Sequence, residues 1–172
     1  PALEDFDISI GNWRNNGWQI NSGPTGSSGT GPDDDITIGG NYIYYETSTG
    51  LTGYYPFVEL SQCFYISGLN NPSLNFNYHM YGNNIGTLNV IVNGDTLCKI
   101  SGNQGGQWLN KQISLSQYLD SDVNIQFIGI YGGGWQGDIA LDNIEVGEFQ
   151  EVVGCMDSTA VNFNPLANVN DT

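Results

Sequence analysis

The sequence predicts an all-β fold, a jelly-roll β-sandwich of two antiparallel sheets followed by a short irregular C-terminal segment. Segments in which apolar and polar residues alternate recur along the chain, whereas few segments carry the period of a helix. The 172 residues include 24 Gly and 21 Asn, which favour tight turns. The alternating segments follow one another at intervals of roughly 8–12 residues, which is typical of sandwiches and barrels.

Alternation defines the expected strands. Residues 41–48 are rich in Tyr and Ile, which favour strands. Within residues 74–80, the side chains at even positions are apolar and those at odd positions are Asn or His, so one face is expected in the core. Residues 88–92 alternate in the same way before Asn93-Gly94, which is a hairpin turn signal. The other expected strands cover residues 97–101, 108–115, 123–131 and 138–146.

Two segments lack this pattern. Residues 21–35 form a polar stretch of Gly, Ser, Pro and Asp whose composition is that of a flexible linker. The composition changes again after Glu151, because residues 154–172 are small residues, Asn and Asp without alternation. We therefore expect a sandwich domain over residues 1–151 and a separate linker or truncated repeat over residues 152–172.

The charge balance excludes several classes of function. Three Lys and Arg residues face 18 Asp and Glu residues, which gives a net charge of -15. Binding to nucleic acid depends on cationic side chains that replace counterions, so this class is disfavoured, as is an anionic membrane surface. No apolar run reaches the roughly 18 residues that a membrane span needs. We expect a secreted or cell-surface protein whose signal peptide has been removed or lies outside this sequence.

Five groups of residues, in order, resemble the motifs of the MAM domain family. They are Thr30-Gly31-Pro32 with Asp35, residues 41–48, residues 78–82 with 86–88, residues 102–105 with Trp108, and residues 137–144. The resemblance covers roughly residues 3–148. The resemblance implies a jelly-roll sandwich in an extracellular adhesion, receptor or protease-associated setting, with no catalysis of its own.

The cysteines depart from the pattern that the resemblance implies. Animal MAM domains typically carry four disulfide-bonded cysteines, one of which precedes the Leu-x-Phe-x-Tyr strand, where this chain has Ser73. Cys63 and Cys98 lie elsewhere. Whether they form a disulfide or remain thiols depends on a Cα separation below about 7 Å, which the sequence leaves open.

The tail resembles short Cys-bounded repeats of large secreted bacterial proteins. The resemblance rests on residues 154–157, Asn164-Pro165 and Asp171. Such repeats usually close with a second cysteine, so we expect the partner of Cys155 to lie beyond Thr172. A bacterial, exported, multidomain parent protein is therefore expected.

The MAM resemblance also implies a structural Ca²⁺ ion between the N-terminal strand, the loop after the Gly-Pro pair and the last strand. The matching positions are Asp7, Asp35, and either Asp138 or Asp142. Hard oxygen ligands from separate segments suit Ca²⁺ better than Zn²⁺. Asp138 and Asp142 share one face of a strand, so the choice between them stays open. A solvated turn is the alternative interpretation of the acidic run at residues 33–35.

Enzymatic function is not expected. His79 is the only histidine, and a packing role is favoured because no second His and no Gly-x-Ser-x-Gly motif accompany it. Glu46 and Glu59 are available as an acid pair for glycoside hydrolysis, which needs two carboxyl groups about 5–9.5 Å apart across a cleft. Sequence spacing does not place these two side chains opposite one another.

Loop aromatics suggest a ligand-binding role. Trp135 lies among glycines, Trp13 stands among Asn and Arg, and Tyr54 and Tyr55 precede a proline. Exposed aromatic rings with flanking amides are typical of sugar recognition, and the alternative is that these rings fold back onto the edge of the sandwich. Two other tryptophans stand where the MAM family keeps an aromatic and are expected in the core: Trp18 and Trp108.

Two functions follow from these observations. The first is a non-catalytic adhesion or targeting module, stabilised by Ca²⁺, which contacts other domains of a secreted protein or a cell-surface protein. The alternative is a carbohydrate-binding module that attaches a secreted enzyme to a polysaccharide through the loop aromatics. Because the chain carries a charge of -15, a neutral polysaccharide is the expected ligand.

Overall fold

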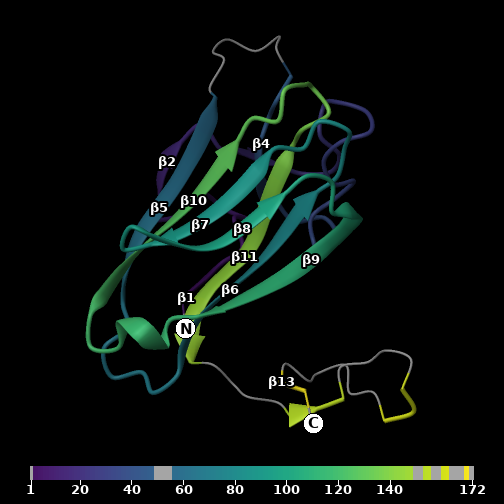
Figure 1. Ribbon diagram of the computed structural model, residues 1–172. Coiled ribbons are helices and arrows are strands. Elements are labelled where there is room, and N and C mark those ends of the chain that lie inside the picture. Colours follow the sequence, from purple (N-terminus) through teal and green to yellow (C-terminus); the bar gives the residue numbers. More distant parts are fainter. Residues whose placement is uncertain (1, 49–55, 149–152, 156–159, 163–168, 171–172) are drawn as a thin grey trace.

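In the computed structural model, two antiparallel sheets are stacked face to face (Figure 1). The structure describes residues 2–48, 56–148, 153–155, 160–162 and 169–170. The six-stranded sheet has the order β3 (Gln19–Asn21), β4 (Tyr42–Tyr45), β11 (Ile139–Glu148), β6 (Pro72–Met80) and β9 (Gly105–Ser114), and β1 (Ala2–Glu4) also pairs with β11. The five-stranded sheet has the order β2 (Arg14–Asn16), β5 (Phe57–Tyr65), β10 (Asp122–Ile130), β7 (Thr87–Val92) and β8 (Asp95–Ser101). The predicted sandwich is confirmed.

Few other elements are present in the described part of the chain. A single 3-10 turn, η1 (Ser116–Tyr118), follows β9, and β12 (Val153–Gly154) pairs in parallel with β13 (Val169–Asn170). No helix of the described residues has the length and apolar character that crossing a membrane requires. The division of the chain after residue 151 stays a prediction.

The expected strands correspond to β4 and to β6–β11, whereas the long strand β5 and the short strands β1, β2, β3, β12 and β13 were not expected. The Asn93-Gly94 turn joins β7 to β8, and Asn93 takes a positive φ of 50° there. Strand β5 (Phe57–Tyr65) escaped the pattern analysis because both of its faces carry apolar side chains. Val58 and Leu60 point into the core, whereas Phe57 and Tyr65 on the other face are exposed, so the alternation of polarity is blurred.

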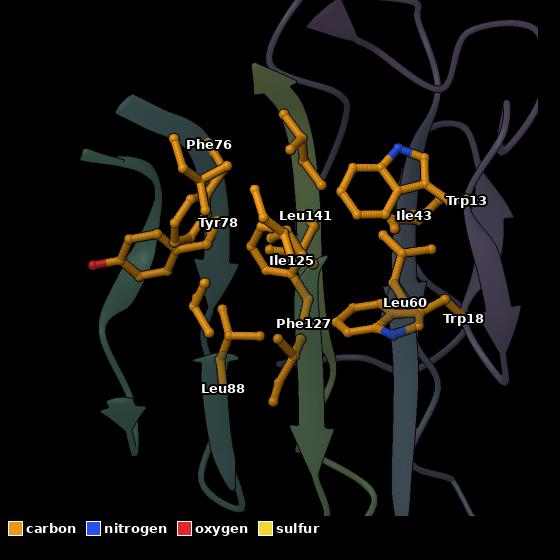
Figure 2. Packing of buried hydrophobic residues seen from close by; sticks show 14 of the residues in the cluster. Trp13, Trp18, Ile43, Leu60, Phe76, Tyr78, Leu88, Ile125, Phe127 and Leu141 are labelled. Atoms are coloured by element: carbon orange, nitrogen blue, oxygen red, sulfur yellow. The ribbon is translucent and has the colours of Figure 1, made fainter. Parts of the chain in front are cut away.

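The core lies between the two sheets and includes a tryptophan that was expected elsewhere. Figure 2 shows Trp13 and Trp18 packed with residues of both sheets. The ring centroid of Trp13 lies 5.5 Å from that of Phe64 and 6.0 Å from that of Phe127, and its side chain is only 7% exposed. The prediction that Trp13 forms part of a sugar-binding surface is therefore wrong. The cause is the start of β2 one residue later, which directs the indole inward. The burial of Trp18 is confirmed.

The linker-like segment at residues 21–35 is an ordered cover over the outer face of the six-stranded sheet. The Tyr42 hydroxyl donates to the Gly23 carbonyl (2.7 Å), and the Trp108 indole N–H donates to the Asp34 carbonyl (2.9 Å). Beneath the cover, Tyr42, Tyr44 and Ala140 form a second apolar cluster with Trp108 at its margin. Trp108 therefore lies outside the main core. Composition alone misidentified this segment because its contacts are to residues far away in the sequence.

The cysteines are thiols. Cys63, Cys98 and Cys155 are free. Cys63 is on β5 and Cys98 on β8, and strands β10 and β7 lie between them in the same sheet. Three inter-strand spacings amount to roughly 14 Å, which is too far for a disulfide.

Candidate functional site

Two buried carboxylates lie along the outer face of β11. Asp138 and Asp142 are both fully buried, and four residues separate them, a distance of roughly 13 Å along an extended chain. In each, the carboxylate oxygen Oδ2 has no hydrogen-bond partner within the described residues. Because buried polar atoms are nearly always paired, both carboxylates require an explanation.

Asp142 lies against Asp35, which belongs to the segment that covers the six-stranded sheet. The two carboxyl groups are close enough for Asp35 to affect the protonation of Asp142. Oδ1 of Asp142 also accepts the backbone N–H of Asn143 (2.7 Å), and Oδ2 of Asp35 accepts the Thr37 hydroxyl (2.7 Å). Asp142, and not Asp138, is therefore the partner of Asp35.

Asp7 joins this pair at Gly40. Oδ1 of Asp7 accepts the backbone N–H of Asn41 (2.7 Å). A Cβ atom at Gly40 would lie 2.5 Å from that oxygen and closer still to Oδ2 of Asp35, so only glycine leaves room for both carboxylates. No three His, Cys, Asp or Glu side chains among the described residues form a ready-made metal cluster. The arrangement is thus a contact pair, Asp35 and Asp142, with Asp7 beside it.

The electrostatics of the pair follow from its burial. Burial and then the hydrogen bond with the adjacent Asp35 carboxyl raise the pKa of Asp142 to about 9, and the Asn143 N–H acts in the opposite direction. Because burial and the neighbouring carboxyl group both oppose its charged form, Asp142 holds its proton more strongly than an exposed carboxyl group does. A cation bound between the two side chains would compete with that proton.

Asp138 belongs to a different cluster, which fastens the covering segment to the sheet. Its Oδ1 accepts the backbone N–H and the hydroxyl of Thr47, each at 3.1 Å, and its own N–H donates to the Thr30 hydroxyl oxygen (2.9 Å). Burial and then the charge of Glu46 raise the pKa of Asp138 to about 6, and hydrogen bonds from threonines oppose this shift. Asp138 therefore holds three segments together.

Trp135 lies in the loop between β10 and β11, at the end of the sandwich opposite the N-terminus (Figure 1). Its side chain is 47% exposed, the largest exposure of any tryptophan in the described chain. The next residue, Gln136, anchors the loop: its carbonyl accepts the Asn84 N–H (2.9 Å), its Oε1 accepts the Asn83 amide (3.0 Å), and its Nε2 donates to the Ser28 carbonyl (3.4 Å). The predicted exposure of Trp135 is confirmed, whereas Tyr54 and Tyr55 lie outside the described residues.

The outer face of the six-stranded sheet carries an aromatic row that the sequence analysis missed. The centroids of the His79 and Trp108 rings are 5.6 Å apart, those of Trp108 and Tyr42 are 5.7 Å apart, and those of His79 and Tyr81 are 6.5 Å apart. Tyr81 ends the row at 40% exposure. In the sequence, His79 lies on the polar face of its strand, and a polar face is expected to be exposed to solvent. The sequence therefore gave no indication that this face is covered.

His79 is a packing residue within this row. It is 2% exposed, and its Nδ1 atom has no hydrogen-bond partner among the described residues. Burial lowers the pKa of His79, against the smaller opposing effects of a hydrogen bond with the Gly106 backbone and the charge of Asp33. The ring is therefore neutral at physiological pH.

Glu46 and Glu59 lie on different sheets. Glu46 follows β4 on the covered face of the six-stranded sheet, where its carboxylate accepts the Ser48 N–H (2.7 Å). Glu59 is on the outer face of the five-stranded sheet and accepts the Gln126 amide (3.0 Å). The two carboxylates therefore do not flank a common cleft.

With the geometry established, comparison with known proteins identifies the family. The model of the family described as "MAM domain, meprin/A5/mu" matches residues 5–151. The chain belongs to the MAM family. The MAM domain-containing glycosylphosphatidylinositol anchor protein 1 of Rattus norvegicus is 34% identical over 139 residues, which cover 73% of this chain and 14% of that protein. Neuropilin-1a of Danio rerio is 30% identical over 151 residues, 81% of this chain and 16% of that protein.

The curated relatives are much longer than this MAM domain, which spans about one seventh of their length. The Cys-bounded bacterial repeat expected in the tail finds no support in these matches, which concern the MAM domain.

Solved structures show the same fold at low identity. A family 61 carbohydrate-binding module crystallised with β-1,4-galactotriose superposes with a TM-score of 0.56 at 14% identity, over 84% of this chain and 94% of that one. The K1 cleaved adhesin domain of Lys-gingipain from Porphyromonas gingivalis superposes with a TM-score of 0.53 at 16% identity, over 87% of this chain and 98% of that one. At these identities the similarity shows the fold alone.

Proposed function

We propose that this MAM domain is a non-catalytic extracellular adhesion or targeting module of a larger secreted bacterial protein. The observation that carries the proposal is the family match over residues 5–151, together with relatives in which the matching domain is a small part of a longer chain. Two features of the described residues support the absence of catalysis. The single histidine is buried among aromatic rings, and Glu46 and Glu59 lie on different sheets.

A bead-attachment assay tests the adhesion proposal. Beads coated with the 172-residue chain are expected to attach to a cell or matrix surface in Ca²⁺ and to detach in EDTA. Beads coated with the Asp142→Asn variant serve as the matched control for a chain without the proposed ion site. Attachment no greater than that of albumin-coated beads, on every surface tried, would contradict an adhesive role.

We further propose a structural Ca²⁺ site at Asp7, Asp35 and Asp142. Ca²⁺ takes 6–8 oxygen ligands and prefers carboxylates from a flexible set. The observations that support the site are the contact between Asp35 and Asp142, the unpaired buried Oδ2 of Asp142, and the close approach of Asp7 at Gly40. Bound there, the ion would join the N-terminal segment, the covering segment and β11, which are far apart in the sequence.

Thermal unfolding with EDTA and with Ca²⁺ tests this site. A ligand that binds only the folded state at 100 times its Kd adds about 2.7 kcal/mol, which raises the Tm of a domain this size by several degrees. The Asp142→Asn variant is expected to lose the Ca²⁺ response. The Asp138→Asn variant is the matched control and is expected to keep it, because Asp138 lies in the other cluster. A Tm that is the same in EDTA and Ca²⁺ would refute the site.

A second candidate function is a carbohydrate-binding module that attaches a secreted enzyme to a polysaccharide. The observation that favours it is the exposure of Trp135 on an anchored loop. The structural similarity to a module crystallised with β-1,4-galactotriose adds support at the level of the fold. Retardation of the chain in gels that contain neutral polysaccharides tests this function, and migration that no polysaccharide alters would argue against it.

A further inference from the structure

We propose that Trp135 and the loops that hold it form a preorganised subsite for a single neutral sugar ring, such as the end of a polysaccharide chain. The inference rests on the carbohydrate-binding function proposed above and specifies its ligand class and its location. Its support comes from three loops next to the exposed indole, which contain Ser28, residues 82–86 and residues 132–137. Hydrogen bonds and close backbone contacts hold these loops together.

The first support is the rigidity of the Trp135 loop. A Cβ atom at Gly132 would overlap the Asn84 carbonyl, and one at Gly137 would lie 2.7 Å from the same oxygen. A Cβ atom at Gly82 would overlap the Gln136 carbonyl. The glycines of these loops therefore allow backbone to pack on backbone. Since the loop is fixed before binding, little conformational entropy is lost when a ligand stacks on the indole.

The second support is the exposed ring itself. Trp135 is 47% exposed, and neither the main core nor the second apolar cluster includes it. Its neighbours in sequence are Gly134 and the anchored Gln136, so the exposed indole belongs to a loop that cannot easily fold away. A fixed, exposed, amphipathic ring is suited to stacking on the apolar face of a pyranose.

The third support is a group of neutral polar residues beside Trp135, which are Asn83, Gln136 and Ser28. The Asn83 side-chain N–H donates to Gln136, and this contact does not use the Oδ1 atom of Asn83, whose side chain is exposed. Ser28 lies on the other side of the Gln136 amide and is exposed. Amide and hydroxyl groups of this kind can exchange hydrogen bonds with sugar hydroxyls at the edge of the stacked ring.

Charge disfavours an anionic ligand at this end of the sandwich. The three cationic residues of the chain are Arg14, Lys99 and Lys111, and each lies within a strand rather than in the loops around Trp135. Asp138 is fully buried, and the Glu46 carboxylate is taken up by Ser48 and Tyr44. An anionic glycan would find no cation at these loops, so a neutral sugar is the fitting ligand.

The exposed indole sets the size of the proposed subsite. Among the tryptophans of the described residues, Trp135 alone is strongly exposed, and one indole covers about one pyranose ring. We therefore expect affinity to reach its limit with one or two sugar units and not to increase with chain length. Tight attachment would then need several copies of the domain on one polymer.

The experiment compares two variants that each lose one exposed aromatic side chain. Trp135→Ala removes the proposed platform, and Tyr65→Ala is the matched control because Tyr65 is 77% exposed on β5, where it pairs with Asp122 at the end of β10 opposite the Trp135 loop. The full chain and both variants are run in affinity gels that contain galactan, xyloglucan, galactomannan or laminarin. Binding of the matching oligosaccharides of one to six units is measured by titration calorimetry, which does not depend on the Trp135 indole as a reporter. Unfolding curves establish that each variant is folded.

The expected result is that Trp135→Ala binds at least about tenfold more weakly than the native chain, while Tyr65→Ala is unchanged. Equal binding by the native chain and Trp135→Ala would overturn the subsite but leave the carbohydrate-binding function standing. Binding of none of the polysaccharides would overturn both. A proline-rich peptide that binds in a Trp135-dependent manner, without any sugar binding, would overturn the subsite and identify the platform as a peptide site.

Discussion

At the scale of single residues, the decisive observations are the protonation and pairing of buried groups. Asp138 and Asp142 have the same residue type, the same strand face and the same burial, yet their partners differ. Asp142 meets another carboxylate and would gain from a cation, whereas Asp138 meets the backbone and hydroxyl of a threonine. Partner chemistry therefore distinguishes a candidate ion ligand from a structural carboxylate.

His79 gives a prediction about the pH dependence of stability. Because burial lowers its pKa in the folded state, the unfolded chain binds a proton near pH 6.5 that the folded chain resists. Stability is therefore lost as the pH falls through about 6.5 and below, by at most about 1.4 kcal/mol per pH unit. Replacing His79 with Gln removes this contribution, so the stability of the native chain should fall more steeply with acidification than that of the variant.

Urea unfolding in EDTA at pH 7.5 and pH 5.5 measures the effect. Carboxylates titrate in both proteins, so their contribution to the loss of unfolding free energy cancels when the native chain is compared with the variant. Parallel losses of stability in the native chain and His79→Gln would show that the imidazole is protonated equally easily in both states.

At the scale of elements, close backbone contacts restrict which residues the loops can contain, as core packing restricts the residues of the strands. Gly86 is a clear example, because a Cβ atom there would overlap the Ile130 carbonyl and lie 2.8 Å from the Gly132 nitrogen. Both contacts are to backbone, which cannot move aside as a flexible side chain can. The turn that leads into β7 and the end of β10 therefore require glycine at this position.

The corresponding prediction compares two glycine substitutions. Gly86→Ala is expected to lower the free energy of unfolding by about 1–3 kcal/mol, because it overpacks a close backbone contact. Gly26→Ala is the control, since a Cβ atom there meets nothing within 4 Å and its φ is not positive. Its effect should remain within about 0.5 kcal/mol. Equal effects in denaturant unfolding would contradict the close packing of these loops.

At the scale of the whole molecule, the few cationic residues occupy sheet edges. Arg14 lies in β2, Lys99 in β8 and Lys111 in β9, and each of these strands is at an edge of its sheet. Charged side chains on edge strands, lysine above all, oppose pairing with the edge of another molecule. The net charge of -15 adds general repulsion that salt screens. We therefore expect the cationic side chains to oppose pairing at their own edge strands, and the acidic surface to oppose association of the molecules in general.

Replacing Lys99 and Lys111 together with Thr is expected to promote self-association, because it leaves β8 and β9 without a lysine. The effect should appear at about 0.5 M salt, where the Debye length falls to a few ångströms and general repulsion is weak. Sedimentation velocity of the variant and of a double Arg control measures it. A variant that sediments as the native chain does, at all salt concentrations, would show that these lysines do not guard the edges.

Much of the fold was predictable because strand formation depends on neighbours within a few residues. Residues 74–80 and 88–92 alternate in polarity, and each lies in a strand with its apolar side inward. The candidate site was predictable only in part. The three carboxylates at Asp7, Asp35 and Asp142 were named from motif positions, but β5 and the aromatic row on the covered face were missed because their polarity patterns are ambiguous.

The sequence by itself determined the all-β class, the positions of most strands and membership of the MAM family, since these depend on local alternation and on motifs in order. Only the tertiary structure decided that Trp13 packs in the core, that residues 21–35 cover a sheet, that Cys63 and Cys98 are apart, and that Asp142 is the partner of Asp35. Each of these outcomes depends on which distant segment a side chain meets. That choice is made by the packing of the whole sandwich, and no short stretch of sequence contains it.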